Sequence, residues 1–72
     1  MKKVSCKKYY EWFDDNIYLN ENVVKSVYTE KHVYKEEWHE KNGDRKVLCM
    51  RTEECYEDEK GWHIHKEYFI AE

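Results

Sequence analysis

The chain has 72 residues, of which 40% are hydrophobic and 40% are charged, and its formal net charge at pH 7 is −3. A chain of this length has room for one small domain, residues 1–72, with a single core. No run of residues approaches the ~20 apolar residues that span a bilayer, and the negative net charge gives no overall attraction to nucleic acid, so we expect neither membrane insertion nor nucleic-acid binding.

Aromatic side chains supply much of the apolar material, since the chain has seven Tyr, three Trp and two Phe. Aromatic residues bury a large area each, which predicts a folded domain with an aromatic core. Proline is absent, there are only two Gly, and Val, Tyr, Trp and Thr favour strands. The composition therefore predicts a mostly β fold.

The N-terminal segment, residues 5–19, is open to two interpretations. Tyr9, Phe13 and Ile17 recur at the spacing of one helical face, and Ser5 is a typical N-cap residue. The aromatic pairs in the same segment favour strands, and residues 14–16 could form a turn between two of them. The alternatives are a meander with two more short strands, or an α+β fold with one helix at about residues 5–16.

A turn-like stretch at residues 20–22 leads into a predicted strand at residues 23–29. The next signal is Asn42-Gly43 between alternating segments at residues 33–40 and 45–52, which is a strong hairpin marker. We expect a three-residue loop in which Gly43 takes a left-handed conformation, because this register separates apolar from charged side chains. It places one set on the inner face (Tyr34, Trp38, Leu48 and Met50) and another on the outer face (Lys35, Glu37, His39 and Arg51).

The C-terminal part reads as a polar loop at residues 53–61 followed by a strand at residues 62–70. Alternation within that strand predicts that Trp62 and Ile64 point inward and that His63 and His65 point outward. The expected fold is a small antiparallel meander.

Two resemblances add to this reading. The segment Gly61-Trp62-His63-Ile64-His65-Lys66-Glu67-Tyr68-Phe69-Ile70 resembles the closing part of SH3-like barrels, with residues 65–68 at the place of their tight turn. This resemblance implies a small closed β-barrel and implies nothing about ligands. In size and in its bias toward Lys, Glu, Tyr and Asn, the chain resembles small accessory proteins of phages and mobile elements.

Four residues could hold a metal ion. Cys49, Cys55, His63 and His65 form a C-x5-C-x7-H-x-H pattern, and zinc takes four such ligands in a tetrahedron. The expected register puts Cys49 on the outer face with both histidines, and Cys55 in the polar loop. Because the C-x2-C spacing of known zinc sites is missing, we favour two surface histidines and two unrelated thiols, and we expect no cofactor.

Catalysis is not expected either. A Cys–His nucleophile needs an oxyanion site and a walled pocket, and a chain this short has few side chains left to build one. Three cysteines cannot all pair within the chain, and no apolar segment follows the basic start, so we expect a cytoplasmic protein with reduced thiols.

The remaining activity is contact with another protein. The acidic run contains five carboxylates around one aromatic ring, and these residues are the predicted contacts with a partner that has a basic surface: Glu53, Glu54, Tyr56, Glu57, Asp58 and Glu59. The sequence thus predicts a non-enzymatic protein-binding module, regulatory or inhibitory, that masks a site on its partner. The alternative is a zinc-binding or nucleic-acid-binding regulator.

Overall fold

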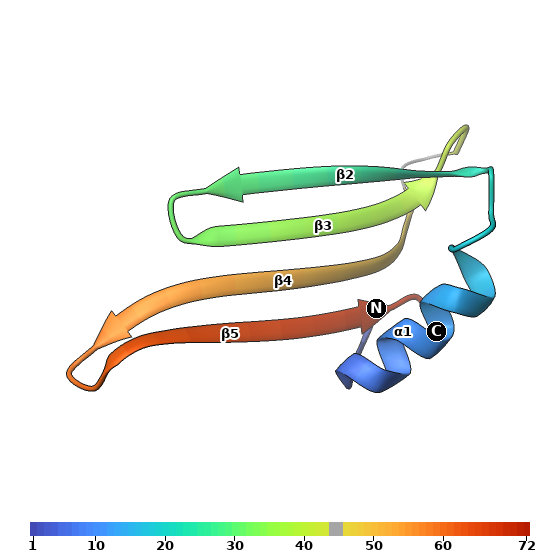
Figure 1. Cartoon of the computed structure of the whole chain (residues 1–72). Coiled ribbons are helices and arrows are strands. Elements are labelled where there is room, and N and C mark those ends of the chain that lie inside the picture. Colours follow the sequence, from blue (N-terminus) through green and yellow to red (C-terminus); the bar gives the residue numbers. More distant parts are fainter. Residues whose placement is uncertain (44–45) are drawn as a thin grey trace.

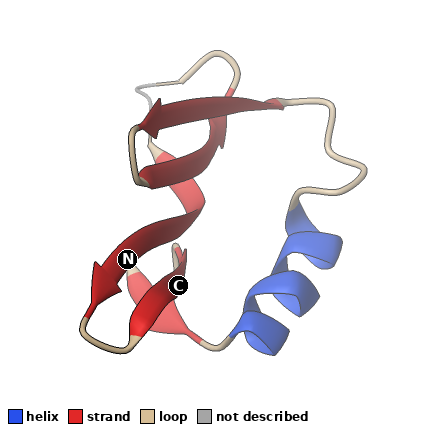
Figure 2. Cartoon of the chain, turned by 60° about the vertical axis from the view of Figure 1, so that its left-hand side comes forward, coloured by secondary structure: helices blue, strands red, loops and turns tan. Residues whose placement is uncertain are grey.

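The computed structural model describes residues 1–43 and 46–72, which form a five-stranded antiparallel sheet with one helix against one face (Figures 1 and 2). The elements in chain order are β1 (Lys2–Val4), α1 (Cys6–Asn16), β2 (Val23–Glu30), β3 (Val33–Glu40), β4 (Val47–Asp58) and β5 (Gly61–Ile70). The strand order in the sheet is β1-β5-β4-β3-β2. Strands β2 to β5 form a meander, so the prediction of a mostly β antiparallel meander is confirmed. The resemblance to SH3-like barrels stays a prediction.

Helix α1 settles the ambiguity of the N-terminal segment: residues 6–16 form a helix, as one of the two interpretations predicts, within a fold that is mostly β. Ser5 is the N-cap, and its Oγ accepts a hydrogen bond of 3.1 Å from the backbone N–H of Lys8. Tyr9 and Phe13 lie one turn apart on the face toward the sheet, and Ile17 caps the other end. Packing of this apolar face outweighs the β preference of the aromatic pairs. Among the described residues, no helix is long and apolar enough to cross a membrane.

The core lies between α1 and one end of the sheet. Its fully buried members are Tyr9, Ile17, Cys49 and Ile70, and partly buried side chains surround them: Val4, Trp12, Phe13, Val23, Trp38, Leu48 and Tyr68. Aromatic rings link the helix to the sheet, with centroids 5.3 Å apart for both Phe13–Trp38 and Tyr9–Tyr68. The expected aromatic core is therefore present, but it occupies only one end of the molecule.

The predicted division of side chains between the two faces of the β3–β4 hairpin is wrong beyond the turn. His39 lies opposite Val47, but Leu48 is an extra residue in β4, and Trp38 consequently lies opposite Cys49. This β-bulge reverses the faces, because a shift of one residue inverts every following side chain. Arg51 shares a face with Trp38, whereas Met50 lies on the other face with Glu37. The bulge brings both Leu48 and Cys49 into contact with the core.

The turn between β3 and β4 lies where Asn42-Gly43 predicts it, but Gly43 is not left-handed. Among the described residues, the glycine with positive φ is Gly61, at 113°. Asp44, the last residue of the expected loop, and Arg45, the first residue of the expected strand, lie outside the described residues.

The predicted polar loop at residues 53–61 is wrong, since β4 continues to Asp58 and only Glu59 and Lys60 connect it to β5. Continuous pairing of β4 with β5 gives the backbone of the acidic run a hydrogen-bonded partner along its whole length. The charged side chains stay accessible because they project from the two faces of the hairpin.

Candidate functional site

The longest hairpin of the sheet, formed by β4 and β5, projects beyond the other strands (Figure 1). Pairing of β3 with β4 ends at Val33 and Glu54, and one further backbone hydrogen bond of 2.8 Å runs from the Cys55 N–H to the His32 carbonyl. On the other side, β1 pairs with β5 only at Tyr68–Ile70. The distal part of the hairpin, residues 55–64, is thus a two-stranded ribbon that we call the distal hairpin.

The tip of the distal hairpin is held by Asp58. Its Oδ1 accepts a hydrogen bond of 2.7 Å from the Lys60 backbone N–H and also lies 2.8 Å from His63 Nε2. The His63 ring in turn stacks on Tyr56, with centroids 5.2 Å apart. The positive φ of Gly61 completes the reversal of the chain. These contacts fix the shape of an otherwise exposed tip.

Large apolar side chains are exposed on both faces of the distal hairpin. Trp62 is 61% exposed and Ile64 is 64% exposed, and both lie on the face that α1 covers farther along the sheet. Tyr56 is 46% exposed on the opposite face. Next to Ile64, a shallow groove of about 280 Å³ runs between the distal hairpin and the β2–β3 turn. Trp62 also contacts that turn, with its ring 5.7 Å from the His32 ring.

The exposure of Trp62 and Ile64 contradicts their predicted inward role. The alternation within β5 is correct, because both residues lie on the same face as the buried Ile70. Helix α1 is too short to reach the distal hairpin, and nothing else among the described residues covers that end. The face is therefore apolar but open.

Negative charge surrounds these apolar side chains. Glu53 is paired with Arg51, at 3.0 Å, and lies 4.0 Å from Lys66. Glu54, Glu57 and Glu59 make no ion pair with any described residue, and all three are exposed. Their charges are available to a partner.

The six predicted contact residues lie along β4 and its turn to β5, not in a loop, and they are divided between the two faces of the hairpin. Tyr56 shares one face with Glu54, whereas Glu53 and Glu57 share the other face with Trp62. Trp62 and Ile64 are candidate contact side chains that sequence reasoning assigned to the core. The signal that could have identified them is the length of the apolar alternation in β5, which exceeds what an 11-residue helix covers.

A network of charged groups separates the core from the distal hairpin. Glu36 is 8% exposed, and its carboxylate accepts hydrogen bonds from Arg51 Nε at 2.7 Å and from the Tyr34 hydroxyl at 3.2 Å. Arg51 also lies over the Tyr34 ring, 5.1 Å from its centroid. This network links β3 to β4 at the base of the distal hairpin.

The four residues of the alternative metal site are not brought together. Cys49 is fully buried in the core, 3.5 Å from the Tyr9 hydroxyl that donates to it. Cys55 lies in β4 opposite Ile64, while His63 and His65 project from the other face. The expected common face is wrong because the bulge at Leu48 moves Cys49 inward. Within the two described segments, no group of three or more His, Cys, Asp or Glu side chains is arranged to hold a metal ion.

Burial also keeps the Cys49 thiol protonated. Desolvation raises its pKa to about 11, although the hydrogen bond from Tyr9 acts in the opposite direction. Thiolates are the nucleophiles and metal ligands among cysteine side chains, so Cys49 is suited to packing and not to chemistry.

Comparisons with family models, with curated proteins and with solved structures find no match for this chain. The geometry of the distal hairpin therefore carries the functional argument.

Proposed function

We propose that this protein is a small non-enzymatic protein-binding module whose distal hairpin covers a basic surface of its partner. The observation that carries the proposal is the exposure of Trp62, Ile64 and Tyr56 on a projecting, structured hairpin whose other strand carries several exposed carboxylates. Large aromatic side chains anchor many protein interfaces, where a few buried contacts supply most of the affinity.

The charge around these side chains determines the kind of surface that the partner must have. Glu54, Glu57 and Glu59 are free of ion pairs with described residues and would face Lys or Arg side chains. Complementary charge at the rim of an interface speeds association and disfavours partners of the wrong sign. The partner surface is therefore basic, such as a protein groove that binds nucleic acid.

The mechanism is steric. The distal hairpin occupies the basic surface and excludes its normal ligand, which makes the protein a regulatory or inhibitory accessory protein of the cytoplasm. The compositional resemblance to accessory proteins of phages and mobile elements supports this role. No catalytic step and no metal ion takes part in it.

The first experiment retains proteins from a nuclease-treated cell extract on the immobilised chain and then measures the purified partner's binding kinetics at two salt concentrations. Replacing the three free carboxylates by Gln (Glu54→Gln, Glu57→Gln and Glu59→Gln) should slow association and flatten its salt dependence. Asp58 is left unchanged because it holds the tip. The matched control replaces three exposed carboxylates of α1 by amides, at Glu11, Asp14 and Asp15. It should change neither the association rate nor the salt dependence of association.

The exposed aromatic side chains of the hairpin should affect the dissociation rate. Trp62→Ala and Tyr56→Ala should accelerate dissociation, by tenfold for each ~1.4 kcal/mol of lost binding free energy. Tyr18→Ala is the control, because Tyr18 is also an exposed tyrosine, at 70%, but follows α1 and belongs neither to the distal hairpin nor to β2. Two outcomes would contradict the proposal. One is the loss of every retained protein when the extract is treated with nuclease, and the other is a set of binding rates that no hairpin substitution changes.

A further inference from the structure

Strand β2 is an edge of the sheet with a free row of backbone groups. It pairs with β3 along all of its eight residues, and no other described strand lies on its far side. The Asn22 carbonyl accepts a hydrogen bond of 2.8 Å from the Lys41 N–H, so the backbone groups of Asn22 point toward β3. Alternate residues of an antiparallel strand direct these groups to opposite sides. The odd-numbered residues therefore present N–H and C=O groups to the free edge: Val23, Lys25, Val27 and Thr29.

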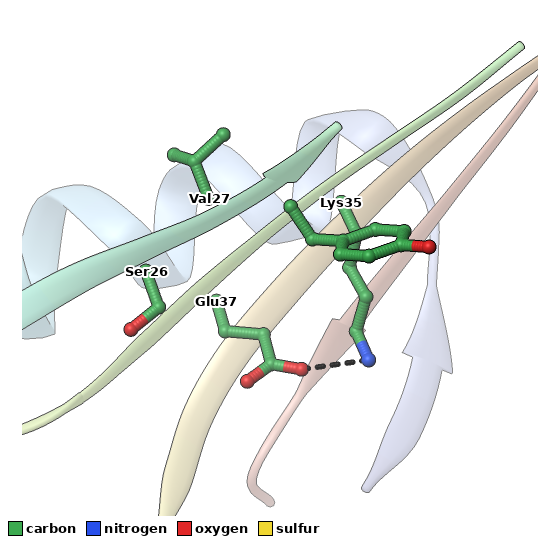
Figure 3. A pocket seen from close by; sticks show the side chains of 5 residues that line it. Ser26, Val27, Lys35 and Glu37 are labelled. Carbon is green, nitrogen blue, oxygen red and sulfur yellow. Dashed lines mark ion pairs between the residues drawn. The ribbon is translucent and has the colours of Figure 1, made fainter. Parts of the chain in front are cut away.

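The side chains of β2 favour pairing with another strand. Five of its eight residues are Val, Tyr or Thr, and it contains no proline. Val27 is 48% exposed and Tyr28 is 51% exposed. Figure 3 shows Val27 and Ser26 projecting from opposite faces of β2, beside the ion pair of Lys35 and Glu37. A shallow hollow of about 370 Å³ lies at this edge, lined by Ser26, Val27, Tyr28, Lys35 and Glu37.

Proteins usually protect an edge of this kind with several charges, a proline or a bulge. Strand β2 has one Lys and one Glu, so its own charge is zero, and its pairing with β3 is regular throughout. An exposed, regular edge rich in β-branched residues pairs readily with a second strand.

We propose that two copies of this chain associate through antiparallel pairing of β2 with the partner's β2, about a two-fold axis at Ser26. In this register the odd-numbered residues exchange about eight backbone hydrogen bonds across the edge. Val24 lies opposite the partner's Tyr28, next to the hollow, and Lys25 lies opposite the partner's Val27. No two like charges face each other. The two sheets become one sheet of ten strands with both helices on the same face.

The charges of the chain favour a second copy as the partner of β2, and they favour the β2 edge over the edge on the other side of the described sheet. Strand β2 has no net charge and is self-complementary about Ser26, whereas a strongly charged partner strand would find only one opposite charge along it. At the opposite side of the described sheet, the short β1 covers only the end of β5. The uncovered part of β5 belongs to the hairpin that carries the five carboxylates of the acidic run, so two copies meeting there would repel each other. Pairing through β2 places the two acidic hairpins at opposite ends of the sheet.

We expect a reversible dimer. One strand edge is a small contact compared with the ~800 Å² that each partner of a stable complex buries. The distal hairpin takes no part in the contact, so the dimer presents two of them, and the inference is independent of what that hairpin binds.

Sedimentation equilibrium over a range of concentrations tests the dimer. The average mass should rise from the 9.0 kDa of one chain toward twice that value. A mass that stays at 9.0 kDa up to millimolar concentration would overturn the proposal.

Charge placed at positions 24 and 28 tests the register. Two like-charged double variants (Val24→Glu with Tyr28→Glu, and Val24→Lys with Tyr28→Lys) put equal charges opposite each other and should lose self-association. The opposite-charged variant (Val24→Lys with Tyr28→Glu) should keep it. The two like-charged variants shift the net charge in opposite directions, which separates the effect of register from that of total charge. Circular dichroism before each run selects the variants that fold.

The distal hairpin supplies the remaining control. Trp62→Ala should leave the dimer unchanged. A dimer that is lost with Trp62→Ala, or that forms equally well in all three double variants, would place the contact elsewhere and would overturn the proposal.

Discussion

At the scale of single residues, the buried contact of Tyr9 with Cys49 makes stability depend on alkaline pH. Burial raises the pKa of the Cys49 thiol to about 11, compared with ~8.5 in an unfolded chain. The unfolded chain therefore loses this proton first, and the stabilisation from the buried thiol is complete below about pH 8.5 and disappears as the pH rises toward 11. We expect this group alone to contribute a loss of about 3 kcal/mol, measured by urea denaturation at a series of pH values.

The Cys49→Ala variant isolates this effect. It is less stable at neutral pH because it leaves a cavity, but its unfolding free energy should fall less steeply between pH 8.5 and 11. Burial likewise raises the pKa of Tyr9, so part of the alkaline loss remains in this variant. Equal slopes for the wild type and Cys49→Ala would show that the thiol is not buried as described.

Two tryptophans of the sheet should differ sharply in their contribution to stability. Trp38 packs against Phe13 in the core, with ring centroids 5.3 Å apart, and Trp38→Ala should cost about 3 kcal/mol or more. Trp62 is 61% exposed, so Trp62→Ala should change the unfolding free energy by about 0.5 kcal/mol or less. Chemical denaturation followed by circular dichroism measures both. Similar losses for the two variants would contradict the exposed position of Trp62.

Sequence reasoning identifies which residues are apolar better than it identifies what covers them. Ser5 and the Tyr9–Phe13–Ile17 spacing predict the helix as one alternative, because a cap and a helical face are local features. Trp62 and Ile64 show the correct alternation, but their burial depends on the length of α1 and on where the sheet extends past it. That is a property of the tertiary arrangement.

At the scale of elements, the β3–β4 turn also depends partly on local sequence and partly on the tertiary arrangement. Asn42-Gly43 predicts the position of the β3–β4 turn, because the dipeptide acts locally. The register beyond it depends on the bulge at Leu48, which exists because both Leu48 and Cys49 reach the core under α1. The metal-site alternative depended on that register, and it loses its geometry for the same reason.

The two glycines provide a matched test at this scale. Gly61 has a φ of 113°, which side chains with a Cβ rarely adopt, so Gly61→Val should destabilise the protein by about 1 kcal/mol or more. Gly43 lacks a positive φ, and an added Cβ would lie 2.9 Å from the flexible carboxylate end of Glu40 and 3.3 Å from the Glu40 Cβ. Gly43→Val should therefore cost less than Gly61→Val. Thermal unfolding of both variants decides, and the reverse order would mean that the strained turn is the other one.

At the scale of the whole molecule, the core and the candidate site lie at opposite ends. The chain extends over 45 × 24 × 19 Å, with the buried side chains gathered under α1 and the distal hairpin beyond the charged network of Glu36 and Arg51. The apolar side chains that would enlarge the core are instead exposed at the far end. A domain this small has little stability to spare, so their exposure fits a surface that a partner completes.

This division predicts a gradient of local stability along β4 and β5. Backbone amides near Cys49 and Ile70 are covered by the core and should exchange with deuterium only on global unfolding. Amides of the distal hairpin, from Cys55 to Ile64, form a two-stranded ribbon with exposed side chains, and such ribbons are marginally stable alone. They should exchange at least about tenfold faster, which corresponds to ~1.4 kcal/mol of lower local opening free energy. Mass spectrometry or NMR of exchanged samples measures both regions in one experiment.

Because Asp58 holds the tip through Lys60 and His63, Asp58→Ala should accelerate exchange in the distal hairpin and leave the core end unchanged. Uniform protection from Cys49 to Ile70 would mean that the distal hairpin is as stable as the core and would contradict this account of how the molecule is divided.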